Sequence, residues 1–278
     1  MENISVVVCV YSGDDADEFE TSLNSIVSQT RPPDELLIVE DGPLTSALNE
    51  TLERIQSTVE VPVCRVRHAE NRGHGAARRT GIDNASHELV AIHDADDIAV
   101  PKRLEWSLDK LKATDADLVG GYIEEFDTDP DEPYAVREVP CEPEEIHKMA
   151  KLRSPVNQTT VLANREAILE AGNYRPVGQM EDYELWARML VNDCKFVNIP
   201  RILAKVRAGD DLYHRRGGLD HVHEEWRLQR HFATIGFVSS PRAGMNFIIR
   251  SIPKLLPNKL REGIYTTLFR QPFSEERP

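Results

Sequence analysis

Short β-branched runs alternate with apolar residues at helical spacing through the first hundred positions, and this alternation restricts the fold more than any other feature. Four runs predict buried strands, at residues 4–10, 36–39, 61–66 and 88–92. Strands that alternate with helices form a mainly parallel sheet through right-handed crossovers. We therefore predict an α/β fold with a Rossmann-like, mainly parallel sheet flanked by helices.

The second half of the chain has a more mixed pattern. Strands are predicted at residues 118–126, 156–162, 196–199 and 202–206, and helices at 144–150 and 181–190. No linker or internal repeat interrupts this part of the sequence. We expect one main unit over residues 1–219 and a helical C-terminal appendage over residues 220–278.

Charge limits the choice of partners. The net charge of −14 argues against a nucleic acid partner, because such partners are held mainly by Lys and Arg on phosphates. The charge is uneven, since residues 241–270 contain six basic side chains and one acidic one. No apolar run is long enough to span a membrane, and no basic, signal-like region precedes the first strand. We expect a cytoplasmic protein.

The cysteines give no sign of a metal site. Cys9, Cys64, Cys141 and Cys194 lie far apart in the sequence, and the first two fall inside apolar strand patterns. Reduced, mostly structural thiols are the expected state in a reducing compartment.

Polar residues follow each of the four predicted strands of the first half. They are Tyr11 and Ser12, Glu40 and Asp41, Arg67 and His68, and the acidic group from Asp94 to Asp97. In open α/β sheets the ligand lies beyond the carboxyl ends of the strands. The sequence therefore predicts that four separate segments converge on one crevice.

Asp94, Asp96 and Asp97 place three carboxylates within four residues at one of these strand ends. Carboxylate oxygens suit Mg²⁺ or Mn²⁺, which complete their coordination with phosphates and water. A solvated turn with a helix cap is the alternative. Asp41, on a neighbouring strand end, favours the ligand-binding interpretation. It is itself either a turn residue or an acceptor for the imide N–H of a nucleotide base.

Residues 71–81 combine small side chains with arginines at the start of a predicted helix. Helix N-termini favour anions, and arginine offers forked donors to phosphate. The glycines alone would be equally explained by close packing, and His74 by a surface position.

Glu181 and Asp182 open another predicted helix, which carries Leu185, Trp186 and Met189. Acids stabilise the first turn of a helix through its dipole, and that effect alone would explain them. The alternative is that Asp182 is a general base, a role that contributes about 10²–10⁴-fold in rate.

Five motifs occur together in this order: SVVVCVYSG, SLNSIVSQTRPPDELLIVEDG, NRGHGAARRTGI, HDADD with Pro101 close behind, and GQMEDYELWARM. Together they resemble the family 2 glycosyltransferases, inverting enzymes of the GT-A fold. The resemblance covers roughly residues 4–215. It divides the main unit into a nucleotide-sugar half at about residues 1–100 and an acceptor half at about residues 101–219.

The resemblance also implies roles for single residues. The nucleotide sugar would be bound by Val10, Tyr11, Asp41, Arg72, Arg78, Asp94 and Ala95, with Asp41 at the base and Asp94 near the ribose. Asp96 would bind the Mg²⁺ or Mn²⁺ that bridges the diphosphate, and Asp182 would deprotonate the acceptor hydroxyl. That oxygen would attack C1 from the face opposite the departing diphosphate, with inversion. The expected donor is a UDP- or GDP-sugar, and the expected acceptor is a glycan or a lipid-linked sugar in surface-glycan, polysaccharide or glycoprotein synthesis.

The sequence departs from the family pattern at two positions. The family more often has Asp where Glu40 stands and Asn where Arg79 stands. A later segment, residues 206–216, occupies the place where many members close a loop over the diphosphate. Arg215 and Arg216 would supply positive charge there, or else form a basic pair on the surface.

Two other classes of function fit the sequence less well. A nucleotidyltransferase would carry a Gly-rich, Arg-containing loop after its first strand, and residues 10–13 lack one. A non-catalytic sugar-nucleotide-binding module would not need both Asp96 and Asp182.

The appendage has apolar residues at helix-like intervals among basic ones from Phe247 to Arg270. Pro253 and Pro257 are expected to split it into short pieces. A basic amphipathic segment can lie in a membrane interface, so peripheral contact with the inner face of the cell membrane is one hypothesis. Packing on the main unit, or on a second subunit in a homo-oligomer, is the other.

Overall fold

The computed structural model describes residues 2–176, 178, 180–208, 219–255 and 271–272. In the first half, four parallel strands lie side by side in the order β4-β1-β2-β3. They are β1 (Ile4–Val10), β2 (Glu35–Glu40), β3 (Val63–Arg67) and β4 (Leu89–Asp94). The predicted α/β architecture is confirmed here with small shifts of the strand ends.

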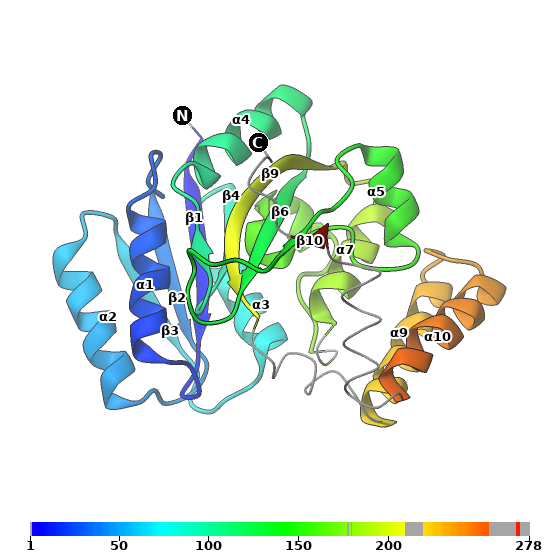
Figure 1. The fold of residues 1–278 in the computed structure, drawn as a ribbon, viewed down its shortest axis with the longest axis horizontal. Coiled ribbons are helices and arrows are strands. Elements are labelled where there is room, and N and C mark those ends of the chain that lie inside the picture. The colour runs from blue at the N-terminus through cyan, green and yellow to red at the C-terminus, as the bar shows by residue number, and fades with distance from the viewer. Residues whose placement is uncertain (1, 177, 179, 209–218, 256–270, 273–278) are drawn as a thin grey trace.

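Helices cover both faces of these strands (Figure 1). The first-half helices are α1 (Ala16–Val27), α2 (Ser46–Thr58), α3 (His74–Asn84) and α4 (Arg103–Thr114). Val6 and Val8 of β1 pack in the core that also contains α1, α2 and α4, whereas Val7 packs in the core on the α3 side. The continuous apolar run of β1 is therefore explained by burial on both faces.

The second half extends the same sheet with mixed strand directions. Its elements are β5 (Ile98–Ala99), β6 (Leu118–Phe126), β7 (Ala135–Arg137), α5 (Pro143–Ala150), the 3-10 turn η1 (Gln158–Thr160), β8 (Leu162–Asn164), α6 (Arg165–Glu170), α7 (Glu181–Val191), β9 (Phe196–Arg207) and β10 (Gln271–Pro272). β8 lies antiparallel between β4 and β6, and β9 runs parallel to β6. The two halves are thus joined through one sheet.

Two predictions for the second half are wrong. Within residues 156–162, Gln158–Thr160 form a 3-10 turn and only Leu162 belongs to a strand. The Thr160 hydroxyl donates to Asn157 O and accepts from the Gly121 amide, which closes the local turn. Residues 196–207 form one strand, β9, which passes its irregular middle through register shifts opposite Gly121 and Tyr122.

The C-terminal part consists of α9 (Leu219–Thr234) and α10 (Ser240–Leu255), which lie at the opposite end of the molecule from α2 (Figure 1). α10 continues through Pro253, so the prediction that this proline splits the segment is wrong. Contacts with α9 and the main unit support the helix, since Asn246 donates to Gln229 at 3.3 Å and to Lys151 O at 2.7 Å. Pro257 lies outside the described residues.

The described helices include none with both the length and the apolarity needed to cross a bilayer. The four cysteines are free thiols, and Cys64 is exposed rather than buried in its strand.

Candidate active site

The strand register brings three predicted site residues together at the carboxyl edge of the sheet. Cys9 pairs with Asp94 across β1 and β4, and Val10 pairs with Glu40 across β1 and β2. Val10 is buried, and its carbonyl accepts a 2.8 Å hydrogen bond from the Asp41 amide. The ends of β1, β2 and β4 therefore meet, as predicted.

Asp41 is held by three hydrogen bonds and is only 5% exposed. Its Oδ1 accepts from His68 Nδ1 and the Arg72 amide, and its Oδ2 accepts from the Gly73 amide, all at 2.8 Å. Gly42 allows this arrangement, since its φ is +95° and a Cβ there would lie 2.7 Å from the Asn71 amide nitrogen. Asp41 thus fixes the loop that leads into α3.

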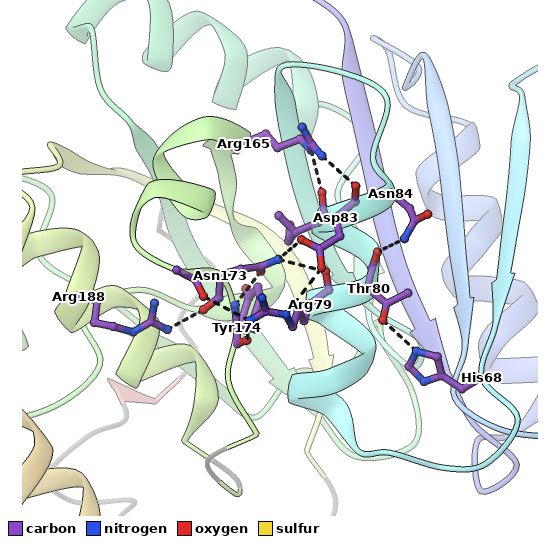
Figure 2. Close-up of polar contacts among 11 residues, drawn as sticks. His68, Arg79, Thr80, Asp83, Asn84, Arg165, Asn173, Tyr174 and Arg188 are labelled. Carbon is purple, nitrogen blue, oxygen red and sulfur yellow. Dashed lines mark hydrogen bonds and ion pairs between the residues drawn. The ribbon is translucent and has the colours of Figure 1, made fainter.

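Figure 2 shows the contacts that fix the second half of α3. The other ring nitrogen of His68 lies 2.9 Å from the Thr80 hydroxyl. Arg79 donates to Tyr174 O at 3.2 Å, and Asn173 donates to Arg79 O and to Asp83. Arg79 therefore joins α3 to the segment before α7.

The first turn of α3 packs closely against the start of α7. A Cβ on Gly75 would lie 2.7 Å from Arg175 O and 3.4 Å from the Glu181 Cβ. A larger residue would push the two segments apart. Close packing therefore explains Gly75, and two helix N-termini lie side by side at the carboxyl edge.

Arg78 connects these two helices to β4. Its guanidinium donates to Asp94 Oδ1 at 2.7 Å and to Glu181 Oε1 at 2.5 Å. Arg78 and Glu181 are buried, and the Asp94 side chain is 32% exposed. Burial favours the neutral acid, but the charge of Arg78 holds the pKa of Asp94 below its usual range. Arg78 was predicted to bind the nucleotide sugar; its guanidinium is engaged within the protein.

Glu181 was not assigned a role beyond stabilising the helix start. Burial, together with the negative charges of Asp182 and Asp94, raises the pKa of Glu181 to about 7 despite the contact with Arg78. One guanidinium is shared between two acids here. The helix pattern indicated Glu181, but only the tertiary structure shows its partner.

His93 organises the acidic turn from within. Arg103 Nη1 donates to His93 Nδ1 at 2.9 Å, so the Nε2–H is the donor to Asp97 O at 3.1 Å. Burial and the positive charge of Arg103 lower the pKa of His93 to about 3, which keeps the imidazole neutral. His93 is therefore a structural residue of the site.

Asp97 faces the interior. It is 3% exposed, and its Oδ1 lies 3.4 Å from the Arg207 amide of β9. Burial and the charges of Asp96 and Asp94 raise its pKa well above the usual value. Asp97 thus connects the turn to β9. Its side chain is buried, whereas Asp94 is half-buried and Asp96 is exposed.

Asp96 is exposed at the end of the turn, next to buried Ala95. Partial burial of the carboxyl and the charges of Asp94 and Glu18 raise the pKa of Asp96 to about 6. Asp14, which sequence reasoning missed, contributes to the same field. Its pKa is raised to about 7 by burial and by Asp96 and Asp94. Its position three residues after Tyr11, beyond the end of β1, was the signal that could have revealed it.

This negative field fits a divalent cation. Carboxylates are hard oxygen ligands, and Mg²⁺ is commonly held by one or two of them together with substrate phosphates. Across the residues that the structure describes, no three His, Cys, Asp or Glu side chains form a ligand cluster by themselves. Asp96 would therefore hold such an ion jointly with the diphosphate.

The remaining residues predicted to bind the ligand differ in burial and in their contacts. Tyr11 is half-buried, donates its amide to Asp14 at 2.9 Å and contacts the His74 ring edge-on. Arg72 is exposed, and its amide is bonded to Asp41. Arg215 and Arg216 lie outside the described residues.

Asp182 lies half-buried in the first turn of α7. The same turn is anchored by Glu184, which contacts Arg188 at 2.6 Å and His231 of α9 at 2.9 Å. Burial opposes ionisation of Glu184, but the hydrogen bonds from His231 and Arg188 lower its pKa. His231 of α9 thus contacts Glu184, and α9 supports the helix that carries Asp182.

Fold and site together define an α/β protein in which carboxylates at parallel strand ends lie near the N-termini of two helices, an arrangement suited to a nucleotide diphosphate and a second substrate. A sequence profile described as Glycosyl transferase family 2 matches residues 5–171. The chain belongs to glycosyltransferase family 2, and the resemblance seen in the sequence is confirmed.

Relatives match over nearly the whole chain. An *Escherichia coli* UDP-Gal:alpha-D-GlcNAc-diphosphoundecaprenol beta-1,3-galactosyltransferase is 32% identical over 268 residues, which cover 96% of each chain. The amylovoran biosynthesis glycosyltransferase AmsE of *Erwinia amylovora* is 30% identical over 265 residues, covering 94% of this chain and 97% of that one. The protein is therefore a glycosyltransferase, as predicted.

A solved structure supports the fold. The mannosyltransferase PcManGT from *Pyrobaculum calidifontis*, in complex with GDP-Man and Mn²⁺, aligns with a TM-score of 0.62 at 16% identity. The alignment covers 96% of this chain and 76% of that one. The GT-A fold class is confirmed.

Proposed function

We propose that this protein transfers a sugar from a UDP-sugar to a hydroxyl of a lipid-linked glycan, with inversion at C1. The observation that carries the proposal is the ion-pair chain Asp94–Arg78–Glu181. It holds the strand end expected to bind the donor beside the helix that begins with the expected base. Donor and acceptor would therefore meet at the carboxyl edge.

Asp41 is the residue we propose for recognition of the base. A carboxylate has about four lone-pair positions, and three hydrogen bonds to Asp41 come from the protein. One position is left for an imide N–H. Because the other bonds fix the carboxylate, little ordering is needed when the base binds.

The donor diphosphate would lie between Asp96 and the start of α3. Asp96 would hold Mg²⁺ or Mn²⁺, which supplies positive charge to the departing diphosphate. The α3 N-terminus presents amide groups and a favourable dipole to the same anion. Asp94, oriented by Arg78, would accept a hydrogen bond from the ribose.

Asp182 would act on the acceptor. Its carboxylate takes the hydroxyl proton as the acceptor oxygen bonds to C1 and the bond from C1 to the diphosphate oxygen breaks. Glu184 and its partners hold the helix that positions this carboxylate.

The acceptor proposal is supported by the *E. coli* relative, whose name specifies a diphosphoundecaprenol-linked sugar. We propose a comparable acceptor, with residues 1–219 as the catalytic unit, acting as a peripheral protein at the inner face of the cell membrane.

Donor binding is tested by thermal shift with a panel of UDP- and GDP-sugars, each with Mn²⁺ or Mg²⁺. A ligand at 100 times its Kd stabilises the folded state by about 2.7 kcal/mol. We expect a metal-dependent shift with at least one UDP-sugar. A shift with GDP-sugars alone would show that the donor is a GDP-sugar instead of a UDP-sugar. No shift with any nucleotide sugar would contradict the proposal.

The base is tested with Asp182→Asn. We expect transfer to fall by about 10²–10⁴-fold while the donor-induced thermal shift is kept. The control is Asp193→Asn just beyond the other end of α7, where φ is +61° and Asn is well tolerated. Unchanged transfer in Asp182→Asn would show that another residue is the base.

A further inference from the structure

The outer face of α10 exposes an apolar stripe. Met245, Ile248, Ile249 and Ile252 are 45%, 59%, 49% and 55% exposed. Their spacing of three, one and three residues places them along one side of the helix. Trp226 of α9 is 47% exposed and contacts Phe247 edge-on, with 5.3 Å between the ring centroids. We call the four α10 residues the α10 stripe.

The inner side of α10 is polar, which inverts the usual pattern of a surface helix. Asn246 is fully buried and bonds Gln229 and Lys151 O. Arg250 donates to Glu225 at 2.7 Å and to Leu152 O at 2.9 Å. A helix that buries an amide and a guanidinium while exposing three isoleucines is built to present an apolar surface to something else.

Charge identifies the occupant. Residues 241–261 contain five basic side chains and no acidic one, in a chain of net charge −14. An anionic surface would attract this segment and repel the rest of the protein, which sets one orientation. A second copy docked stripe to stripe would instead bring two basic segments together. On the adjacent helix α9, Arg227 and Arg230 are exposed, and the acids are exposed Asp220 in its first turn, half-buried Glu224 and buried Glu225.

We propose that the α10 stripe docks on an anionic lipid bilayer, with its isoleucines at the acyl boundary and basic side chains at the headgroups. The inference rests on the proposed function in that the acceptor is lipid-linked. It goes further by assigning the contact to one helix face.

The docked face is connected to the catalytic helix through Arg250. The Arg250 guanidinium lies 5.3 Å from the Tyr183 ring centroid and 3.8 Å from the Met180 sulfur, the residues on either side of Glu181 and Asp182. His231 and Glu184 join α9 to the same first turn of α7. Docking of α10 would therefore fix the distance of Asp182 from the membrane surface, where a lipid-linked acceptor presents its sugar.

The test is co-sedimentation of the full chain with vesicles of phosphatidylcholine alone and of phosphatidylcholine with about one-third phosphatidylglycerol. We expect binding to the anionic vesicles that weakens as salt is raised from low to high concentration, because screening shortens the range of the attraction. Ile248→Glu/Ile252→Glu should lower the partition coefficient by at least about tenfold, since it removes apolar contact and adds repelled charge. Val191→Glu, at a 40% exposed position on α7, is the matched control and should bind as the unchanged protein does.

Each outcome is decisive. Equal binding of the double variant and the unchanged protein, or no binding to anionic vesicles at all, would overturn the inference. A dimer in sedimentation velocity that dissociates in the double variant, without vesicle binding, would assign the stripe to a second copy instead. The donor-induced thermal shift, measured on the same variants, reports separately on the proposed function: it should persist in the double variant, and its absence from the unchanged protein would contradict the proposed function alone.

Discussion

The ends of β2 and β4 both place acids at the carboxyl edge of the sheet, but the burial and the neighbours of these acids differ. At the end of β2, Asp41 is buried and accepts hydrogen bonds from His68 and two backbone amides. At the end of β4, the Asp96 residue is exposed, and partial burial of its carboxyl, together with the charges of neighbouring carboxylates, raises its pKa.

The difference separates an acid whose charge is balanced by protein donors from an acid whose charge an incoming cation would balance. A carboxylate whose charge is met by protein donors stabilises the fold by being present. A carboxylate crowded by like charge destabilises the fold and is retained where an incoming cation relieves the repulsion. Asp94 stands between these cases, because Arg78 balances its charge.

Removing the Arg78 guanidinium should have the largest effect on the free energy of unfolding. Arg78→Met leaves Asp94 and Glu181 as neighbouring acids without their shared cation, so we expect a loss of about 3–5 kcal/mol in unfolding free energy. Urea denaturation at neutral pH measures it. The adjacent Arg79→Met is the control, with a loss of about 1 kcal/mol or less, because Arg79 is half exposed and bonds mainly backbone carbonyls. Equal losses of unfolding free energy in both variants would contradict the role of Arg78 as the cation that balances Asp94 and Glu181.

Asp96→Asn should separate activity from stability. We expect transfer to fall by about 10²–10³-fold, comparable to the loss of one electrostatic contact to the transition state, and the dependence on Mn²⁺ to weaken. The melting temperature should rise at pH 8, since the ionised carboxyl that is removed has a raised pKa in the folded state. Full activity, or a lower melting temperature, would contradict this view of the β4 end.

Asp41→Asn should destabilise the protein, in contrast to Asp96→Asn, which should stabilise it. An amide has one acceptor oxygen, so at least one of the three donors would face an NH₂ group. The cost is about 1–3 kcal/mol in unfolding free energy. Asp15→Asn, which keeps the N-cap of α1, should change stability little. If Asp41→Asn is as stable as the unchanged protein, the donors to Asp41 do not stabilise the fold as we describe.

The pH dependence of stability gives the smallest effect. The pKa of Glu181 is raised to about 7 in the folded state, so folding favours its protonated form. Its contribution is therefore present at low pH and is lost as pH rises through about 7. We expect the unfolding free energy to fall between pH 5 and pH 8, and to fall less steeply in Glu181→Gln. The exposed Glu170→Gln should retain the original slope; parallel slopes for Glu181→Gln would show that Glu181 does not titrate in this range.

Much of the first half was predictable from the sequence. The apolar runs at β1 and β2 are long enough to require burial on both faces, and that requirement dictates a parallel sheet with helices on each side. Once the sheet is parallel, its carboxyl ends must share an edge. For this reason Asp41 and Asp94 could be placed together before the structure was known.

The second half was less predictable. The 3-10 turn at Gln158–Thr160 depends on side-chain bonds to Gly121, far away in the chain. α10 continues past Pro253 while packed against α9. Local patterns carry no record of such partners, so propensity was outweighed by tertiary contacts.

The sequence by itself determined the sheet, the edge that carries the acids and the family. Only the tertiary structure decided what each acid faces: Arg78 for Asp94, protein donors for Asp41, the interior for Asp97 and other carboxylates for Asp96. The physical reason is that strand periodicity depends on neighbours along the chain, whereas the charge state of a carboxyl depends on groups that folding brings within a few ångströms of it.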